Sequence, residues 1–497
     1  MHRRRMLSAT VLACVLALLA IPSRALPAPE ASPDVSPAGK IPLTTKSEAA
    51  RADYLRGRDL TERLRVQESR PFFEKAVAAD PDFALAWLGL ANTQPSANEF
   101  FAKLGKAGAL SGKASEGERL MILGATAGAQ GNVTAQVAHL EALVTQFPQD
   151  ERALVLLGTA HFGAQRYREA IDLYERAAKV APDFSQIYNQ LGYSYRFLGE
   201  MTKAEAAFKK YTEVLPDDPN PWDSYAELLM KLGRFDEAIT NYRKALALRP
   251  DFFNSSYGIA SCLDLQGKGA AARSELDAAL AKAQDDGQRR TGLFAKTVSY
   301  TFEGNFAAAQ AEMEKQRVLA EKANDPLGIA GDEIAMGNLA IAANDVAGAA
   351  KRFDEAAARV EAAPRVAEAN KANQRRFAIY NRAQVALAKG DLAAAKQLSS
   401  ELATAVAKSG NPFQVRLSHE IAGRLALAEK LWDAAIAELG QANLLNPYNR
   451  YRLSQAYAGK GDSAKAQELV ASARNDNTLT NLNFALVRLK IQADAAR

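Results

Sequence analysis

The sequence predicts an all-α protein made of stacked helix pairs, and three observations support this fold class. Apolar residues make up 48% and charged residues 24% of the 497-residue chain, so the chain can bury a core. Alanine, the strongest helix former, dominates the apolar share, and the runs of Val, Ile and Thr that are typical of strands are nearly missing. The chain also repeats itself at a constant interval, with proline and glycine at matching places.

The chain begins with the three parts of a secretory signal peptide. A basic stretch, Arg3–Arg5, precedes an apolar run, 6–21, and the tripeptide 23–25 places small residues at the two positions that signal peptidase reads. The apolar run is shorter than the roughly 20 residues that span a bilayer comfortably. We therefore expect residues 1–25 to be removed and the protein to be exported, to the periplasm or out of the cell. In the alternative, the run stays uncleaved and tethers the protein to the membrane.

Charge and cysteine content narrow the choice of partners and of stabilising bonds. Without residues 1–25 the chain carries 58 basic and 57 acidic side chains, so it has no overall field that would favour nucleic acid. Cys14 belongs to the apolar run and only weakly resembles a lipoprotein box. Cys262 is then the one cysteine left, so no intramolecular disulfide can form. We expect packing to hold the mature protein together and no nucleic-acid partner.

A repeat organises the chain beyond its N-terminal part. Helical periodicity begins near Ser47, after a Pro- and Ala-rich segment, 26–45, that has no core pattern. From Glu151 onward each copy has a small residue early in its second helix, an aromatic residue after it and a proline at its end. These marker alanines are spaced by 34 residues: Ala170, Ala204, Ala238 and Ala272.

This period and residue set resemble the tetratricopeptide repeat family, most specifically between residues 151 and 270. The resemblance implies a right-handed superhelical solenoid of about 11–12 antiparallel helix pairs, regular in 117–270 and irregular with longer helices after 285. We expect the small residues to lie where the two helices of a copy cross, the aromatic residue to fill the space between neighbouring copies, and the proline to end the second helix. The structural positions of the repeat are Gly158, Ala170, Pro182, Gly192, Ala204, Pro216, Ala238 and Pro250.

The same pattern divides the chain into four predicted segments. After Ala272 the spacing of the marker alanines becomes irregular, which indicates longer helices or loops. These later markers are Ala309, Ala349, Ala395, Ala435 and Ala466. We predict a signal peptide, a linker, an N-terminal repeat array and a C-terminal array that ends in a closing helix: 1–25, 26–45, 46–280 and 281–497.

The resemblance also predicts where this protein would bind a partner. In the family, the first helices of successive pairs line a concave wall that holds peptides or protein segments. We expect a non-catalytic protein–protein interaction scaffold without a cofactor or metal, and the sequence does not indicate its oligomeric state. The expected wall residues are polar or aromatic and lie on first helices: Arg152, Thr159, Gln186, Asn189, Tyr193, Arg196, Asn220, Asp223, Glu227, Lys231, Asn254 and Tyr257.

Motifs for catalysis are weak in this sequence. Residues 267–272 and 459–464 match a dinucleotide fingerprint in their letters, but both lie at turns between helices and follow no strand. His139, His161 and His419 are unpaired with other His or Cys residues at metal-ligand spacing. An enzyme with a site in the irregular C-terminal half is the less favoured alternative.

Overall fold

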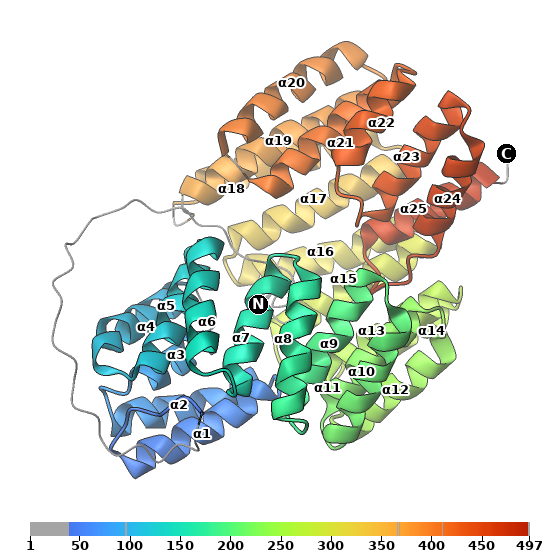
Figure 1. Cartoon of the computed structure of the whole chain (residues 1–497). Helices are drawn as coiled ribbons and strands as arrows, with labels where there is room; N and C mark the ends of the chain where they lie inside the picture. Colours follow the sequence, from blue (N-terminus) through green and yellow to red (C-terminus); the bar gives the residue numbers. More distant parts are fainter. Residues whose placement is uncertain (1–38, 95–96, 365, 367, 410, 496–497) are drawn as a thin grey trace. The chain divides into compact units, whose positions relative to one another are not determined.

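The computed structural model of the protein describes residues 39–94, 97–364, 366, 368–409 and 411–495. Within these ranges the chain consists of α-helices, a single 3-10 helix and turns, with no β-strand (Figure 1). The predicted all-α repeat fold is confirmed. The predicted signal peptide and most of the predicted linker lie outside the described residues.

Contacts divide the chain into two compact units, Met1–Leu228 and Leu229–Arg497. The border therefore falls inside α11 (Pro219–Lys231), whereas the sequence pattern placed it near residue 280. The helices of the first unit form pairs and lead into α11: α1 (Glu48–Glu62) with α2 (Val66–Ala79), α3 (Ala84–Asn92) with α4 (Ala97–Leu110), α5 (Glu116–Ala129) with α6 (Val133–Gln146), α7 (Glu151–Gly163) with α8 (Tyr167–Val180), and α9 (Ser185–Leu198) with α10 (Met201–Val214). The 3-10 helix, Ser111–Lys113, follows α4.

The second unit continues the pairing with longer helices. Those from α15 to α21 have 17 to 22 residues, against 13 to 15 in most of the first unit, as expected after residue 285. The helices from α22 to α25 have only 10 to 14 residues. The helices are α12 (Phe235–Leu248), α13 (Phe253–Leu265) with α14 (Gly269–Leu280), α15 (Asp286–Phe302) with α16 (Phe306–Lys322), α17 (Pro326–Ala342) with α18 (Val346–Ala362), α19 (Glu368–Lys389) with α20 (Leu392–Ser409), α21 (Pro412–Ala428) with α22 (Trp432–Gln441), α23 (Pro447–Lys460) with α24 (Ser463–Arg474), and α25 (Leu482–Ala495).

Glycine and a large side chain meet at the crossing inside a helix pair. A Cβ added at Gly158 would lie 2.5 Å from Cε1 of the Tyr174 ring, and one at Gly192 would lie 2.6 Å from the Phe208 ring. The aromatic residue therefore packs within its own pair. It also meets a glycine of the next copy where Phe73 faces Gly89 and Tyr242 faces Gly258, so there it fills the space between copies as expected. The same contact recurs sixteen residues apart in Gly57 and Phe73, Gly124 and Leu140, Gly337 and Phe353, and Gly423 and Leu439.

The alanine, proline and glycine positions of the repeat lie where the sequence pattern predicts them. The marker alanines, Ala170, Ala204 and Ala238, are completely buried. Pro182, Pro216 and Pro250 each follow a second helix by two residues, where the missing N–H and the fixed φ of proline prevent its continuation. At the turn between α9 and α10, Gly199 has a φ of +80°, which a residue without a Cβ adopts easily.

Part of the predicted linker belongs to the first unit. The Ile41 N–H donates to Asp150 Oδ2 at 2.9 Å, and the Thr44 N–H donates to Glu118 Oε1 at 2.9 Å. Lys40 adds an ion pair with Glu151. The segment before α1 thus runs across the starts of α5 and α7, so the prediction of a linker as far as residue 45 is wrong at its C-terminal end. Hydrogen bonds to distant helix caps hold a segment that has no periodicity of its own.

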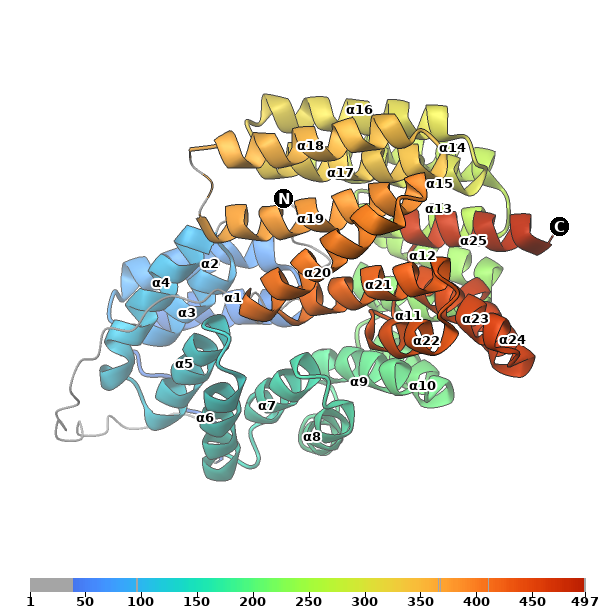
Figure 2. The ribbon, with the colours of Figure 1, turned by 90° about the horizontal axis from the view of Figure 1, so that it is seen from above.

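The last helix of the second unit returns to an earlier part of the chain. Figure 2 shows α25 beside α15, and the two helices are in direct contact. Leu482 and Ala485 share a core cluster with Val298 of α15 and Met336 of α17. The predicted closing helix therefore does more than cap the final pair, because its apolar face is buried against helices far back in the sequence.

Candidate functional site

Equivalent positions of the repeat define the wall formed by first helices. We call the residue fifteen places before each marker alanine the wall position, since it lies near the middle of a first helix. Its neighbour four residues later lies one helical turn along the same face. The wall positions before Ala204, Ala272, Ala395 and Ala435 are Asn189, Tyr257, Tyr380 and Glu420.

In the first unit, the wall of α9 and α11 contains an interlocked polar set. The Tyr193 hydroxyl donates to Glu227 Oε2 at 2.9 Å, and the Arg196 guanidinium donates to Glu227 Oε1 at 2.8 Å. Burial, and then the charge of Glu227, raise the pKa of Tyr193 well above its usual value. The phenol therefore keeps its proton and remains a donor at neutral pH.

Asn189 lies on α9 one turn before Tyr193 and is 5% exposed. In the described part of the chain, no hydrogen-bond donor reaches its buried Oδ1. A buried amide oxygen without a donor costs about 1–3 kcal/mol, so its retention calls for an explanation. The oxygen is enclosed, so a donor from a bound segment could reach it only after neighbouring side chains move.

Other predicted wall residues of the first unit are engaged inside the fold. Arg152 of α7 donates to Glu62 of α1 at 2.6 Å, and Asn220 of α11 donates to the Tyr211 hydroxyl of α10 at 2.9 Å. Thr159 is exposed and shares a hydrogen bond of 3.3 Å with the Tyr174 hydroxyl. Arg152 and Asn220 therefore connect helices, which corrects their prediction as open contact residues. Gln186 and Asp223 are half-buried on α9 and α11.

In the second unit, the chain itself covers the predicted wall residues of α11 and α13. The Tyr257 hydroxyl donates to the backbone carbonyl of Thr480, and Ser261 Oγ lies 3.1 Å from Thr480 Oγ1. Lys231 pairs with Asp476, while Asn254 is half-buried at the start of α13. The non-helical segment 475–481, between α24 and α25, makes these contacts. The prediction of Lys231 and Tyr257 as open groove residues is thus corrected, because a segment more than 200 residues away lies on them.

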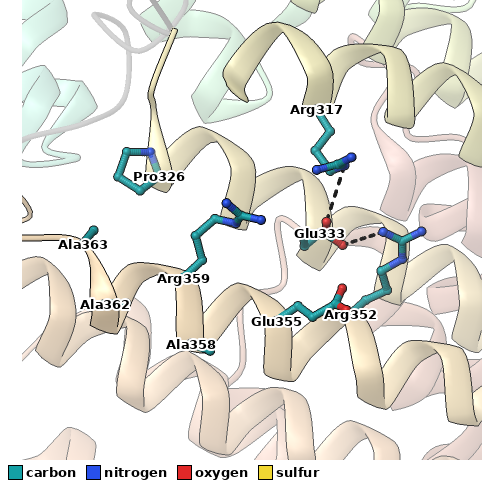
Figure 3. Close-up of a pocket in the computed structure, with 9 residues that line it drawn as sticks. All are labelled: Arg317, Pro326, Glu333, Arg352, Glu355, Ala358, Arg359, Ala362 and Ala363. Atoms are coloured by element: carbon teal, nitrogen blue, oxygen red, sulfur yellow. Dashed lines mark hydrogen bonds and ion pairs between the residues drawn. The ribbon is translucent and has the colours of Figure 1, made fainter. Parts of the chain in front are cut away.

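A separate solvent-open cleft of about 700 Å³ lies over α16, α17 and α18 (Figure 3). Buried Glu333 of α17 pairs with Arg352 at 2.8 Å and with Arg317 at 3.6 Å, which ties the three helices together. Among the described residues, the lining of this cleft combines the carboxylates of Glu333 and Glu355 with the guanidiniums of Arg317, Arg352 and Arg359.

Three buried carboxyl groups have raised pKa values, and each has its own partners. Burial raises the pKa of Asp264 to about 7 and that of Asp332 to about 6, and it also raises the pKa of Glu118. They lie on α13, α17 and α5, and none of the three donates to or accepts from another. Within the described ranges, no group of three or more His, Cys, Asp or Glu residues is placed to hold a metal ion. None of the described helices is both long and apolar enough to cross a membrane.

The comparisons with known proteins agree with the repeat architecture. Residues 155–219 and residues 229–296 match two sequence models, each described as tetratricopeptide repeat. The fold is that of a helical repeat protein, and these two stretches contain tetratricopeptide repeats.

Curated relatives match only part of the chain. The anaphase-promoting complex subunit CDC16 of Saccharomyces cerevisiae is 24% identical over 210 residues, which are 40% of this chain and 25% of that protein. The peroxisomal targeting signal receptor of Candida albicans is 26% identical over 211 residues, 40% of this chain and 36% of the receptor. Human tetratricopeptide repeat protein 13 is 33% identical over 93 residues, 18% of this chain and 11% of that protein. The chain thus spans about a third or less of the length of these relatives.

Solved structures of repeat proteins are also similar to part of the chain. A tetratricopeptide repeat protein from Parabacteroides merdae has a TM-score of 0.40 and 18% identity, covering 51% of this chain and 95% of its own. YrrB, described as a TPR protein with an unusual peptide-binding site, has a TM-score of 0.28 and 17% identity, covering 36% and 91%.

Proposed function

We propose that the protein is an exported scaffold that binds an extended segment of a partner protein along the wall of α7, α9 and α11. The tetratricopeptide repeat family consists in general of non-catalytic protein–protein interaction scaffolds. The wall of the first unit combines an unsatisfied amide acceptor, a phenol and a charged pair within two helical turns. Such groups can hold the backbone and polar side chains of an extended chain with little regard to its sequence.

One observation carries this proposal. At the wall position of α13, Tyr257 donates a hydrogen bond to the backbone carbonyl of Thr480, and one turn on Ser261 contacts the Thr480 side chain. The wall of this protein therefore already holds a non-helical segment by its backbone. Asn189 and Tyr193 are the equivalents of Tyr257 and Ser261 two copies earlier, and we place the bound segment of another chain at this position of the wall.

The relatives are consistent with this role. The peroxisomal targeting signal receptor is, by its name, a receptor for a targeting signal.

Removal of the Asn189 acceptor is the direct test. Peptides selected from a random displayed library on the full protein are expected to bind Asn189→Ala roughly three- to tenfold more weakly in a titration, as for the loss of one hydrogen bond. Lys179→Ala, an exposed change on the second helix α8, is the matched control and should leave the affinity unchanged. Selected peptides that bind both variants equally well would remove the α9 wall from the proposal.

Export has its own test. The basic, apolar and small-residue parts of 1–25 support a cleaved signal, so the mature protein is expected to begin at Leu26. Mass spectrometry of the N-terminus of protein taken from the cell envelope measures this directly. An intact N-terminus on membrane-bound protein would instead establish the tethered alternative.

A further inference from the structure

The wall positions of α19 and α21 form a polar centre around a buried carboxylate. Glu420 is 4% exposed, and its Oε1 accepts from the Tyr380 hydroxyl and from Arg452, each at 2.8 Å. Its Oε2 accepts from Asn449 Nδ2 at 2.9 Å. Side chains from three consecutive first helices, α19, α21 and α23, therefore converge on one point.

This centre holds more positive than negative charge. Arg424, one turn after Glu420 on α21, lies 3.7 Å from the carboxylate and donates to the neutral amide of Gln384 at 2.9 Å. Two guanidiniums thus share one carboxylate, and the side chains of Arg424 and Arg452 are only 16% and 13% exposed. Burial, followed by the charge of Arg452, lowers the pKa of Arg424. A partly buried excess of positive charge is unfavourable until an anion approaches it.

An apolar surface lies farther along the same helices. The rings of Phe377 on α19 and Phe413 on α21 are 6.3 Å apart, and Phe413 is 51% exposed. Beside them, Arg376 donates to the uncharged side chains of Gln414 and Asn373. These hydrogen bonds do not pair Arg376 with a carboxylate. Arg376 therefore adds a second positive charge to this wall, besides that of Arg424.

We propose that α19, α21 and α23 form a second binding wall, which selects an acidic protein segment that also carries an apolar anchor. The apolar side chain rests on Phe377 and Phe413, and a side-chain carboxylate reaches Arg424 and Arg452. From Phe413 to Arg424 the helix rises about 16 Å, which an extended chain covers in about five residues. The favoured segment thus has its acidic residues about five positions from a large apolar residue. This wall lies within the second unit and uses no contact of the α7, α9 and α11 wall.

Charge complementarity favours an acidic segment over a neutral or basic one at this wall. Guanidinium pairs bind carboxylates with directed, charge-assisted hydrogen bonds, and a wall with one carboxylate against three guanidiniums repels basic segments. Arg452 is also held over the Tyr448 ring, 4.1 Å from its centroid, which orders the guanidinium before any ligand arrives.

Two labelled peptides test the proposal on the full protein by fluorescence anisotropy. One carries Leu and, about five positions later, two Glu residues in a Ser- and Ala-rich background; the other has Gln in place of Glu. The acidic peptide is expected to bind more tightly, and salt is expected to weaken it. Arg424→Gln should weaken the acidic peptide roughly tenfold, as for loss of one charge-assisted pair, and leave the Gln peptide unchanged.

Glu420→Gln is expected to change the affinity for the acidic peptide in the opposite direction to Arg424→Gln. It therefore distinguishes a binding role of this centre from a purely structural one. It removes the carboxylate that competes with the ligand, so the acidic peptide should bind more tightly, whereas a merely structural centre would be damaged and bind less. Arg382→Gln, an exposed change elsewhere on α19, is the charge-matched control. If a change at the buried centre prevents folding, Phe413→Ser at the exposed end should still weaken both peptides. Equal affinity for the two peptides, or weaker binding by a folded Glu420→Gln, would overturn the proposal.

Discussion

Gly192→Ala is expected to lower the urea concentration at which the protein unfolds, although alanine is the better helix former. The new Cβ would lie 2.6 Å from the Phe208 ring, and Phe208 is completely buried, so the ring has no free space to enter. Overpacking of this kind costs roughly 1–3 kcal/mol, which exceeds the roughly 1 kcal/mol gained from helix propensity.

Gly105→Ala is the matched control for this prediction. Gly105 lies inside α4 of the same unit, and a Cβ there would meet nothing within 4 Å. This variant should therefore become more stable, by up to about 1 kcal/mol. Circular dichroism during urea titration measures both variants. Equal shifts in one direction would show that the contact between Gly192 and Phe208 does not govern the crossing.

Asp264→Asn is expected to stabilise the protein above pH 7 and to have little effect near pH 4. Burial raises the pKa of Asp264 to about 7, and Ser299 Oγ donates to its Oδ1 at 2.7 Å. In the unfolded chain the same carboxyl has a pKa of about 3.9. Between these two values the unfolded chain releases a proton that the folded protein keeps, so stability falls as the pH rises from about 4 to about 7.

Asparagine has no proton to lose and removes this penalty. The gain in the free energy of unfolding should reach at least about 1.4 kcal/mol above pH 7, the equivalent of one pKa unit. Denaturant unfolding at pH 4 and at pH 8 measures it. Asp354→Asn, an exposed change on α18, serves as the control and should show no such difference between the two pH values. A gain that is the same at both pH values would contradict a raised pKa for Asp264.

The wall of α13 is covered by the chain's own segment 475–481. We therefore place the proposed binding sites on the first unit and on helices α19 to α23. Tyr257 and Ser261 are already engaged with Thr480, and Leu479 packs against the core cluster that contains Tyr257 and Ala260. A partner at that place would have to displace a segment fixed by apolar and polar contacts. No hydrogen bond from segment 475–481 to Asn189 or Arg424 is present in the described part of the chain. The two residues differ in charge, so the two walls are expected to select different segments.

The wall positions themselves were within reach of the sequence. Counting fifteen residues back from Ala395 and Ala435 leads to Tyr380 and Glu420, although the irregular spacing of the C-terminal half concealed them. The glycine and aromatic pairs at a sixteen-residue offset were a second such signal, since Gly337 with Phe353 continues the series begun by Gly158 with Tyr174. The partners of Glu420 were not predictable, because Arg452 and Asn449 belong to the next pair and share no fixed offset with it.

The sequence by itself determined the helix pairs, their order and the face of each first helix that forms the wall. These features depend on contacts between residues about 16 or 34 positions apart, which recur in several copies and leave a period in the sequence. Only the tertiary structure decided which parts of the wall are covered. The contacts of Thr480 and Asp476 with Tyr257, Ser261 and Lys231 join residues 219 to 245 positions apart. Each of these contacts occurs once, so it leaves no periodic pattern in the sequence from which it could be predicted.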